Sequence, residues 1–223
     1  LAQQIHEVQD HRYTISAEVL KLSRRTIVGQ GEVLVARKPF KVYTWVDRGH
    51  YRVGDTIHAN FKAQTLDRKP VRGKGTLKLL RITYKDNQPL ESEVADWNLD
   101  TDAQGRADLK IQASRGGQYR LAYTVVDAND HTIEGGYIFT VRGKSDNGTQ
   151  FRFAKIELIP DKREYVPGET VRLQINTDRR GAAVVVFVRP VNGVYLPPKV
   201  IPMTGKSALQ EIVVAKKDIP NFF

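Results

Sequence analysis

The feature that most constrains this chain is an internal repeat. The segment "YRVGDTIHANF" (51–61) matches "YVPGETVRLQI" (165–175) at a constant offset of 114 residues, counted from Tyr51 to Tyr165. The shared positions are a tyrosine, a glycine, an acidic residue and a threonine, followed by alternating apolar residues. Asp47 and Asp161 precede the two copies at the same spacing. Such self-similarity indicates one structural unit that is used more than once.

A second match has a different offset, 106 residues, counted from Tyr13 to Tyr119. It aligns "YTISAEVLKLSRRTIVGQGEVLVAR" (13–37) with "YRLAYTVVDANDHTIEGGYIFTVRG" (119–143) without a gap. The two offsets together define a unit of about 105–115 residues that opens near a Y-x-x-G-[DE]-T turn and closes with a hairpin.

These boundaries predict three parts. Residues 1–38 hold the closing hairpin of one unit, 39–146 hold a complete unit, and 147–223 hold the opening part of a third. We therefore interpret the outer two parts as incomplete units of a longer array. Their missing pieces are complementary, and unpaired strand edges tend to associate. We therefore expect domain-swapped self-association, in which hairpin 13–37 completes the third unit of another chain.

Short apolar runs separated by turn residues predict an all-β fold. In the complete unit the expected strands are 42–47, 56–64, 76–84, 93–99, 106–112, 118–127 and 133–141. In the third unit they are 153–159, 170–177, 183–189, 194–201 and 208–215, with a two-residue turn at Asn192-Gly193. This spacing is typical of tandem seven-stranded β-sandwiches of immunoglobulin or fibronectin III shape.

Composition limits the chemistry. The chain has no cysteine, so it has no disulfide, thiolate metal site or thiol nucleophile. The net charge is +10, but acidic residues are interleaved with the basic ones. We therefore interpret the tightest basic cluster as a solvated surface and expect no nucleic-acid partner. That cluster consists of Arg68, Lys69, Arg72, Lys74 and Lys78.

Other polar motifs predict no catalytic, cofactor or metal site. In "DWNLDTDAQG" (96–105), the alternating Asp96, Asn98, Asp100 and Asp102 resemble a calcium loop, but Thr101 and Ala107 stand where an EF-hand needs glycine and glutamate. "VRGKGT" (71–76) lacks the spacing of a phosphate-binding loop. The five histidines show no metal-ligand spacing; they are His6, His11, His50, His58 and His131. "NGT" (147–149) is a formal glycosylation sequon. We expect a protein that is not an enzyme.

Several motifs in order resemble the macroglobulin (MG) domains of the alpha-2-macroglobulin family. "DKREYVPGETV" (161–171) and "DRGHYRVGDTI" (47–57) are similar to the opening of such domains, and "LDRKPVRGKGTLKL" (66–79) to the loop that follows. "DTDAQGRADLKI" (100–111) and "GGQYRLAYTVVDA" (116–128) are similar to its later strands, and "VRPVNGV" (188–194) and "DIPNFF" (218–223) to the domain that leads into the bait-region domain of bacterial members.

The resemblance implies a scaffold segment of a secreted or periplasmic, cell-envelope protease-trapping endopeptidase inhibitor. Its partners would be neighbouring MG domains and, through the full-length parent, proteases; it would need no cofactor. A cysteine-dependent thioester cannot lie within this chain. A rival hypothesis is a sandwich array of a surface adhesin or carbohydrate-active protein that uses Trp45 or Trp97 as a sugar platform. An exposed, coplanar aromatic pair would favour this rival, and buried tryptophans would favour the scaffold.

Overall fold

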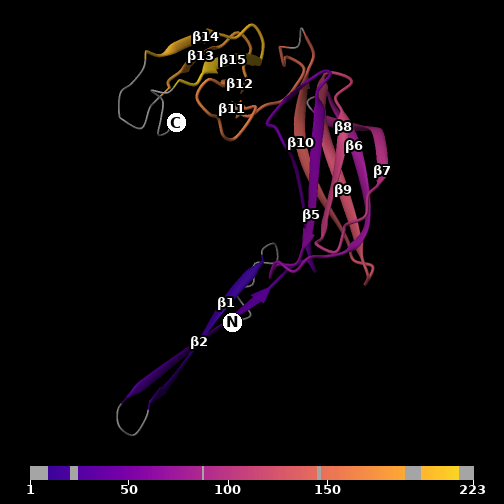
Figure 1. Ribbon diagram of the computed structural model, residues 1–223, viewed down its shortest axis with the longest axis vertical. Helices are drawn as coiled ribbons and strands as arrows, with labels where there is room; N and C mark the ends of the chain where they lie inside the picture. Colours follow the sequence, from indigo (N-terminus) through magenta and orange to yellow (C-terminus); the bar gives the residue numbers. More distant parts are fainter. Residues whose placement is uncertain (1–9, 21–24, 87, 145–146, 189–196, 216–223) are drawn as a thin grey trace.

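The computed structural model describes residues 10–20, 25–86, 88–144, 147–188 and 197–215, and every regular element in these ranges is a β-strand (Figure 1). The all-β prediction is therefore confirmed. In chain order the strands are β1 (His11–Leu20), β2 (Thr26–Val35), β3 (Lys41–Val46), β4 (Tyr51–Arg52), β5 (Thr56–Gln64), β6 (Gly73–Lys85), β7 (Gln88–Asn98), β8 (Arg106–Gln112), β9 (Gly117–Asp127), β10 (Thr132–Arg142), β11 (Ile156–Pro160), β12 (Thr170–Thr177), β13 (Ala183–Val186), β14 (Lys199–Pro202) and β15 (Ser207–Val213).

The middle of the chain, which we call the middle unit, is a sandwich of two sheets. One sheet has the order β3-β5-β8 and the other β4-β10-β9-β6-β7. Alternate side chains of each strand point into the space between the sheets, where the rings of Phe61 and Tyr123 lie 4.4 Å apart. The sequence predicted seven strands here. The structure adds β4, which is only two residues long and pairs in parallel with the end of β10.

Strand β6 begins at Gly73, inside the segment that the sequence treats as a loop. It can do so because the chain after β7 runs along it: the Gly75 N–H donates to the Asp100 carboxylate at 3.0 Å. A side chain at Gly75 would place its Cβ 2.0 Å from the carbonyl oxygen of Leu99. Glycine therefore serves a close approach between two chain segments here, which explains why a glycine-rich run lies within a strand.

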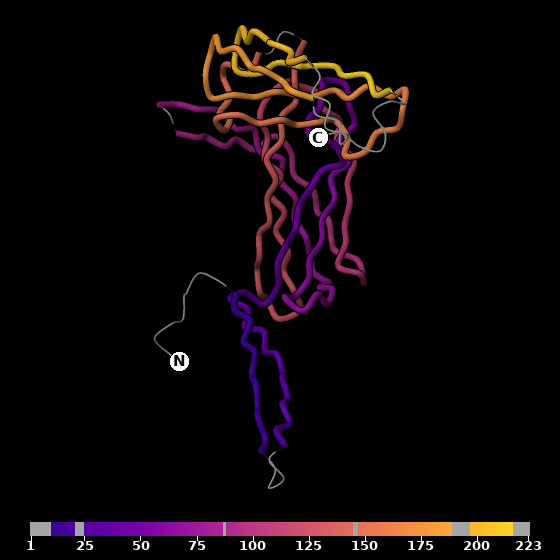
Figure 2. The backbone as a smooth tube through the Cα atoms, turned by 90° about the vertical axis from the view of Figure 1, so that its left-hand side faces the viewer, coloured from indigo at the N-terminus to yellow at the C-terminus, as the bar shows by residue number. Residues whose placement is uncertain are grey.

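Strands β1 and β2 form an antiparallel hairpin that extends from one end of the middle unit (Figure 2). Its register pairs Tyr13 with Val33, and β9 and β10 pair Tyr119 with Phe139 in the same way. The 106-residue repeat is therefore a repeat of strand pairing as well as of sequence. At the base of the hairpin, the Asp10 carboxylate accepts the Arg37 N–H at 3.0 Å and forms an ion pair with Lys41.

The described residues 147–188 and 197–215 form the third unit, at the opposite end of the middle unit (Figure 2). It has a three-stranded sheet, β11-β12-β15, and a two-stranded sheet, β13-β14, around a small core of Ile175, Val184 and Met203. The register of β11 on β12 repeats that of β3 on β5: Ile156 is opposite Thr177, as Val42 is opposite Ala63. The predicted turn at Asn192-Gly193 and the motif at 218–223 lie outside the described residues.

Most predicted strands overlap observed ones, but β7 begins at Gln88 and not at residue 93, and β14 covers Lys199–Pro202 where the expected strand was 194–201. Three expected strands, 56–64, 106–112 and 170–177, have the observed bounds of β5, β8 and β12. The prediction that a strand starts at residue 153 is wrong, because β11 begins at Ile156. The preceding residues instead form a turn closed by a hydrogen bond from the Phe151 N–H to the carbonyl oxygen of Gly148.

Candidate functional site

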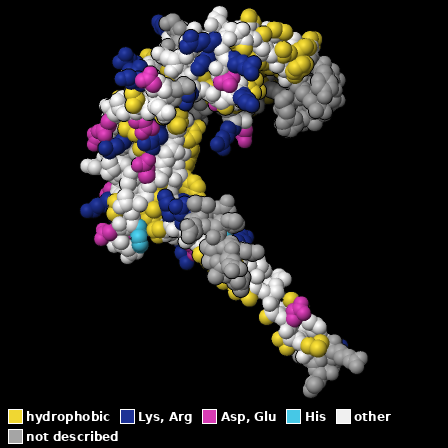
Figure 3. Space-filling view, turned by 180° about the vertical axis from the view of Figure 1, so that it is seen from behind, with side chains coloured by type: hydrophobic (Ala, Val, Ile, Leu, Met, Phe, Trp, Pro, Cys, Tyr) yellow, Lys and Arg dark blue, Asp and Glu magenta, His cyan; other side chains and the backbone are white. Residues whose placement is uncertain are grey.

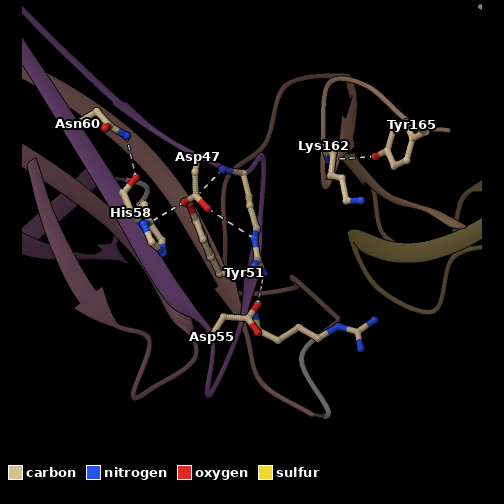
Figure 4. A network of polar contacts seen from close by, with 9 residues as sticks. Asp47, Tyr51, Asp55, His58, Asn60, Lys162 and Tyr165 are labelled. Atoms are coloured by element: carbon tan, nitrogen blue, oxygen red, sulfur yellow. Dashed lines mark hydrogen bonds and ion pairs between the residues drawn. The ribbon is translucent and has the colours of Figure 1, made fainter. Parts of the chain in front are cut away.

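The repeated "D-x-x-x-Y-x-x-G-[DE]-T" motif folds into a hydrogen-bonded corner in each unit. In the middle unit the Tyr51 hydroxyl donates to the Asp47 carboxylate at 2.5 Å and accepts the Arg48 N–H at 3.1 Å (Figure 4). The same carboxylate oxygen accepts the N–H of His58 on β5 at 2.9 Å. Asp47 thereby joins the tyrosine of the turn to the strand that follows it.

The acidic residue and the glycine of the motif form the turn itself. The Asp55 carboxylate accepts the Arg52 N–H at 2.9 Å, and Gly54 has a φ of 100°, which favours glycine. The Gly54 N–H donates to the carbonyl oxygen of Ala113 at 2.8 Å, which ties the turn to the end of β8. The aspartate, tyrosine, glycine and acidic residue of the repeat each have a hydrogen bond or a backbone angle that accounts for them.

The third unit repeats this network with the same atoms. The Tyr165 hydroxyl donates to Asp161 at 2.8 Å and accepts the Lys162 N–H at 2.9 Å, and the Arg172 N–H donates to the same Asp161 oxygen at 2.8 Å. Gly168 has a φ of 97°. The ion pair differs in length: the Lys162 ammonium lies 2.5 Å from Glu169, whereas the Arg48 guanidinium lies 3.6 Å from Asp55.

The electrostatics of the corner are those of a fixed structural contact. Burial and the adjacent Asp161 carboxylate raise the pKa of Tyr165 to about 12, and burial raises that of Tyr51 still further. Burial also raises the pKa of Asp161, but the hydrogen bonds from Arg172 and Tyr165 lower it by more, so the net shift is downward. At neutral pH the tyrosines stay protonated donors and Asp161 stays a charged acceptor, which fixes the turn and leaves no proton to transfer.

The middle and third units meet at the loop between β3 and β4. Gly49 lies so close to β11 that an added Cβ would be 2.5 Å from the carbonyl oxygen of Pro160. His50 beside it is buried, contacts the backbone of Ile159, and has a pKa lowered by burial. The negative charge of Asp161 opposes that lowering of the His50 pKa, whereas the positive charges of Arg142 and Arg52 add to it. The interpretation of His50 from the sequence did not place it at a joint between units, because no local pattern marks such a contact.

A second contact region joins the linker after β10 to the middle unit. The guanidinium of Arg152 lies 5.5 Å from the centre of the Tyr84 ring, and the Gln118 side-chain amide donates to the carbonyl oxygen of Arg152 at 3.3 Å. Tyr84 in turn donates to Gln118 at 2.8 Å. The third unit is thus attached to the middle unit by side-chain contacts in addition to the chain connection.

The two tryptophans do not form one platform. Trp97 is on β7 and packs partly buried against the core, whereas Trp45 is on β3, in the other sheet, and is 39% exposed. Trp45 borders a surface hollow of about 540 Å³ whose lining is rich in hydrogen-bonding side chains. The lining residues are Trp45, Asn60, Phe61, Lys62, Arg106, Ala107 and Asp108.

The remaining polar candidates serve local structure. Asp102 accepts the N–H groups of Gln104 and Arg106 and so caps a turn, while Thr101 is buried and bonded to Gly73 and Val71. No group of three or more potential metal ligands occurs among the described residues.

The other histidines are separated from one another. His131 contacts Asp127 at 3.0 Å, His11 lies beside Tyr13, and His58 is exposed. His6 lies outside the described residues.

Within the basic cluster, Lys69 and Lys78 pair with Asp67 and Glu93. Asn147 of the sequon is exposed, and its carbonyl oxygen accepts two N–H groups from the turn before β15. No helix long and apolar enough to cross a membrane occurs in the described part of the chain.

Comparison with known proteins gives distant structural likenesses. No family model and no curated protein matches the chain. Salmonella alpha-2-macroglobulin reacted with methylamine is 14% identical over 93% of this chain and 14% of that one, with a TM-score of 0.40. Trypsin-activated alpha-2-macroglobulin from Escherichia coli is 17% identical over 93% and 15%, with a TM-score of 0.37. A tetra-tandem repeat of a large adhesion protein is 12% identical over 96% and 51%, with a TM-score of 0.31.

The chain spans about a seventh of the length of the two alpha-2-macroglobulins that it resembles. At these scores the likenesses carry no argument about function, which must come from this chain's own residues.

Proposed function

We propose that this chain is a non-catalytic scaffold segment of an alpha-2-macroglobulin-like endopeptidase inhibitor that acts in a secreted or periplasmic, cell-envelope setting. Its partners are neighbouring sandwich domains and, through a longer parent protein, the proteases that the parent traps. The observation that carries the proposal is the duplicated corner: the motif that resembles the opening of MG domains forms the same hydrogen-bond network in two successive units.

The joint between the units supports the same role. A scaffold that surrounds a protease must hold its domains at fixed relative positions. Gly49, His50 and Arg152 all make contacts between the middle and third units of the kind that restrict such motion. The polar residues of the two corners are engaged in hydrogen bonds that close turns, as expected of a scaffold.

The chain itself provides the first test. Added to trypsin in excess, it should leave the hydrolysis of a small chromogenic peptide and of a large protein substrate unchanged, because a scaffold segment does not occupy a protease active site. Inhibition of the small substrate by this chain alone would overturn the scaffold role.

A protein that contains this chain provides the second test. After reaction with trypsin it should block the hydrolysis of a large protein substrate and spare the small peptide, because a trapped protease is screened from large molecules only. Equal inhibition of both substrates, or of neither, would contradict protease trapping.

Trp45 supports a second candidate function, carbohydrate binding. Its exposed indole borders a hollow with amide, carboxylate, ammonium and guanidinium groups, and aromatic rings of this kind stack on sugar faces. The test is a glycan array with the wild-type chain and with Trp45→Ala. Binding that is lost in Trp45→Ala and retained in Trp97→Phe would establish this function, and absence of wild-type binding would remove it.

A further inference from the structure

The hairpin β1-β2 exposes a face that is buried where the same hairpin occurs in the middle unit. Ile15 and Val19 are each 58% exposed, whereas their equivalents Leu121 and Val125 on β9 are fully buried. The residues on this face are all apolar or glycine apart from His11: they are Tyr13, Ile15, Ala17, Val19, Ile27, Gly29, Gly31, Val33 and Val35. The opposite face of β1 is mainly polar. Hydrophobic side chains are visible along the hairpin (Figure 3), and an amphipathic sheet face that no described residue covers indicates an interaction surface.

Gly29 indicates that the missing neighbour of this face is a crossing strand. Its equivalent, Gly135, is crossed closely by β3, since a Cβ there would lie 2.3 Å from the carbonyl oxygen of Val42. Around Gly29 itself, nothing lies within 4 Å of the same added atom. The hairpin thus carries the glycine that a crossing strand requires, at a position where no described strand of this chain crosses.

The third unit provides a strand of the right kind. Its β11 is equivalent to β3, and the residue that corresponds to Val42 is Ile156, which is 57% exposed. Strand β13 pairs only with β14 among the described strands, whereas β6, its counterpart in the middle unit, pairs with β7 on one edge and β9 on the other. Within its described residues, the third unit therefore leaves one edge of β13 unpaired and has an exposed position at Ile156, where a β9-β10 hairpin would pack.

The hydrogen-bonded corners at Tyr51 and Tyr165 also differ in burial. Tyr51 is fully buried because β10 runs beside it, with Val141 opposite Tyr51 in the register and the Phe139 ring 5.9 Å away. Tyr165 in the third unit is only partly buried, and a second copy of β10 would cover it as β10 covers Tyr51.

We propose that the hairpin β1-β2 of one chain completes the third unit of a second copy of this chain. In this arrangement β1 adds to the open edge of β13, β2 lies beside Tyr165, and the backbone of Ile156 crosses Gly29. The added strand extends the sheet by backbone hydrogen bonds, and the apolar face of the hairpin covers the small third core. One departure from the middle unit is expected: Pro167 replaces Val53, so the bond from the Val53 N–H to the Arg142 carbonyl has no counterpart.

This contact joins different surfaces of the two partners, so it forms closed rings or open chains of copies. The proposal does not depend on protease trapping. It is tested with the full chain by light scattering coupled to size exclusion, over about a hundredfold range of concentration. We expect the mass to rise with concentration in multiples of the 25.2 kDa chain. A monomer throughout the range would overturn the proposal.

Two glycine variants distinguish this specific contact from nonspecific hydrophobic association of the hairpin. Gly29→Val should raise the concentration needed for association by about tenfold or more, because its side chain meets the crossing backbone. Gly31→Val is the matched control: it adds the same side chain to the same face, but at the position of Tyr137, where the middle unit holds a large residue. Both glycines have open space around them in the single chain, so neither change disturbs the hairpin. Equal effects of the two variants would contradict the proposed register.

Mixing two defective chains tests the direction of the contact. Gly29→Val keeps an intact third unit, and Ile156→Asp, at an exposed position, keeps an intact hairpin. At a concentration at which the wild-type chain just associates, each variant alone should stay monomeric, and an equimolar mixture should form a one-to-one dimer and nothing larger. Failure of the mixture to dimerise, when both variants retain the wild-type thermal unfolding profile, would overturn the proposal, as would association of either variant alone at that concentration.

Discussion

The tyrosine hydroxyl of the repeated motif makes the same hydrogen bonds in both units, although its burial differs. Tyr51 and Tyr165 each bridge an aspartate and a backbone N–H, yet only Tyr51 is fully buried. The bond that each makes is local, within four residues of the tyrosine, and follows directly from the motif. The free energy that it contributes depends on the surroundings, because a buried polar atom that loses its partner cannot turn to water.

Tyr51→Phe should therefore lower the free energy of unfolding of the middle unit by about 1–3 kcal/mol, since it leaves the Arg48 N–H without its acceptor and Asp47 without a donor. The measurement is urea unfolding followed by tryptophan fluorescence. Both tryptophans lie in the middle unit, so the signal reports that unit alone. Tyr165→Phe is the control and should leave this transition unchanged. Equal shifts of this transition in both variants would contradict the role of the Tyr51 hydroxyl.

At the scale of strands, periodicity located most elements, because alternation over seven to nine residues reflects a sheet with one buried face. Periodicity did not predict strand segments that form only because another segment lies beside them. Strand β4 has only two residues and exists because β10 lies beside it, and β6 extends back to Gly73 because the chain after β7 runs alongside. Both are consequences of neighbours distant in sequence, which no local pattern contains.

The close approach at Gly75 gives a prediction about that element. Gly75→Ala should lower the free energy of unfolding of the middle unit by more than about 2 kcal/mol, because its Cβ would overlap the Leu99 carbonyl and the Tyr123 hydroxyl. Gly136→Ala on β10 is the matched control. Its nearest neighbours lie at 3.4 Å, one of them an Arg120 side-chain atom, and a change within about 0.5 kcal/mol is expected. Urea unfolding by tryptophan fluorescence measures both, and similar losses in the two variants would refute the interpretation of β6.

For the whole molecule, the joint between the middle and third units adds a dependence on pH. Burial lowers the pKa of His50 below its ordinary value of 6.5, so the folded state binds its proton less readily than the unfolded state. The neutral imidazole therefore contributes stability that is fully present above pH 6.5. That contribution is lost progressively as the pH falls from 6.5 toward the lower folded-state pKa.

His50→Gln should accordingly reduce the loss of thermal stability between pH 7.5 and pH 5.5, as measured by differential scanning calorimetry. His58→Gln, on the exposed face of β5, should keep the wild-type pH dependence. If the thermal stability of His50→Gln falls between pH 7.5 and pH 5.5 as steeply as that of the wild type, His50 is not the source of this pH dependence.

The sequence by itself determined the all-β fold, the two repeat registers and the composition of the corners. These depend on short-range rules: alternation sets which side chains share a face, and an aspartate, a tyrosine and a glycine at fixed spacing close a turn. It also offered Trp45 and Trp97 as one pair of candidates, which the structure places in different sheets.

Only the tertiary structure decided which repeated surfaces are covered. Leu121 and Ile15 occupy equivalent positions in paired strands of the same register, and one is buried while the other is exposed. The burial of His50 between two units is likewise a property of the assembled chain. Burial depends on segments that are distant in sequence. Similar local sequences can therefore form hairpins of the same register and still pack against different neighbours.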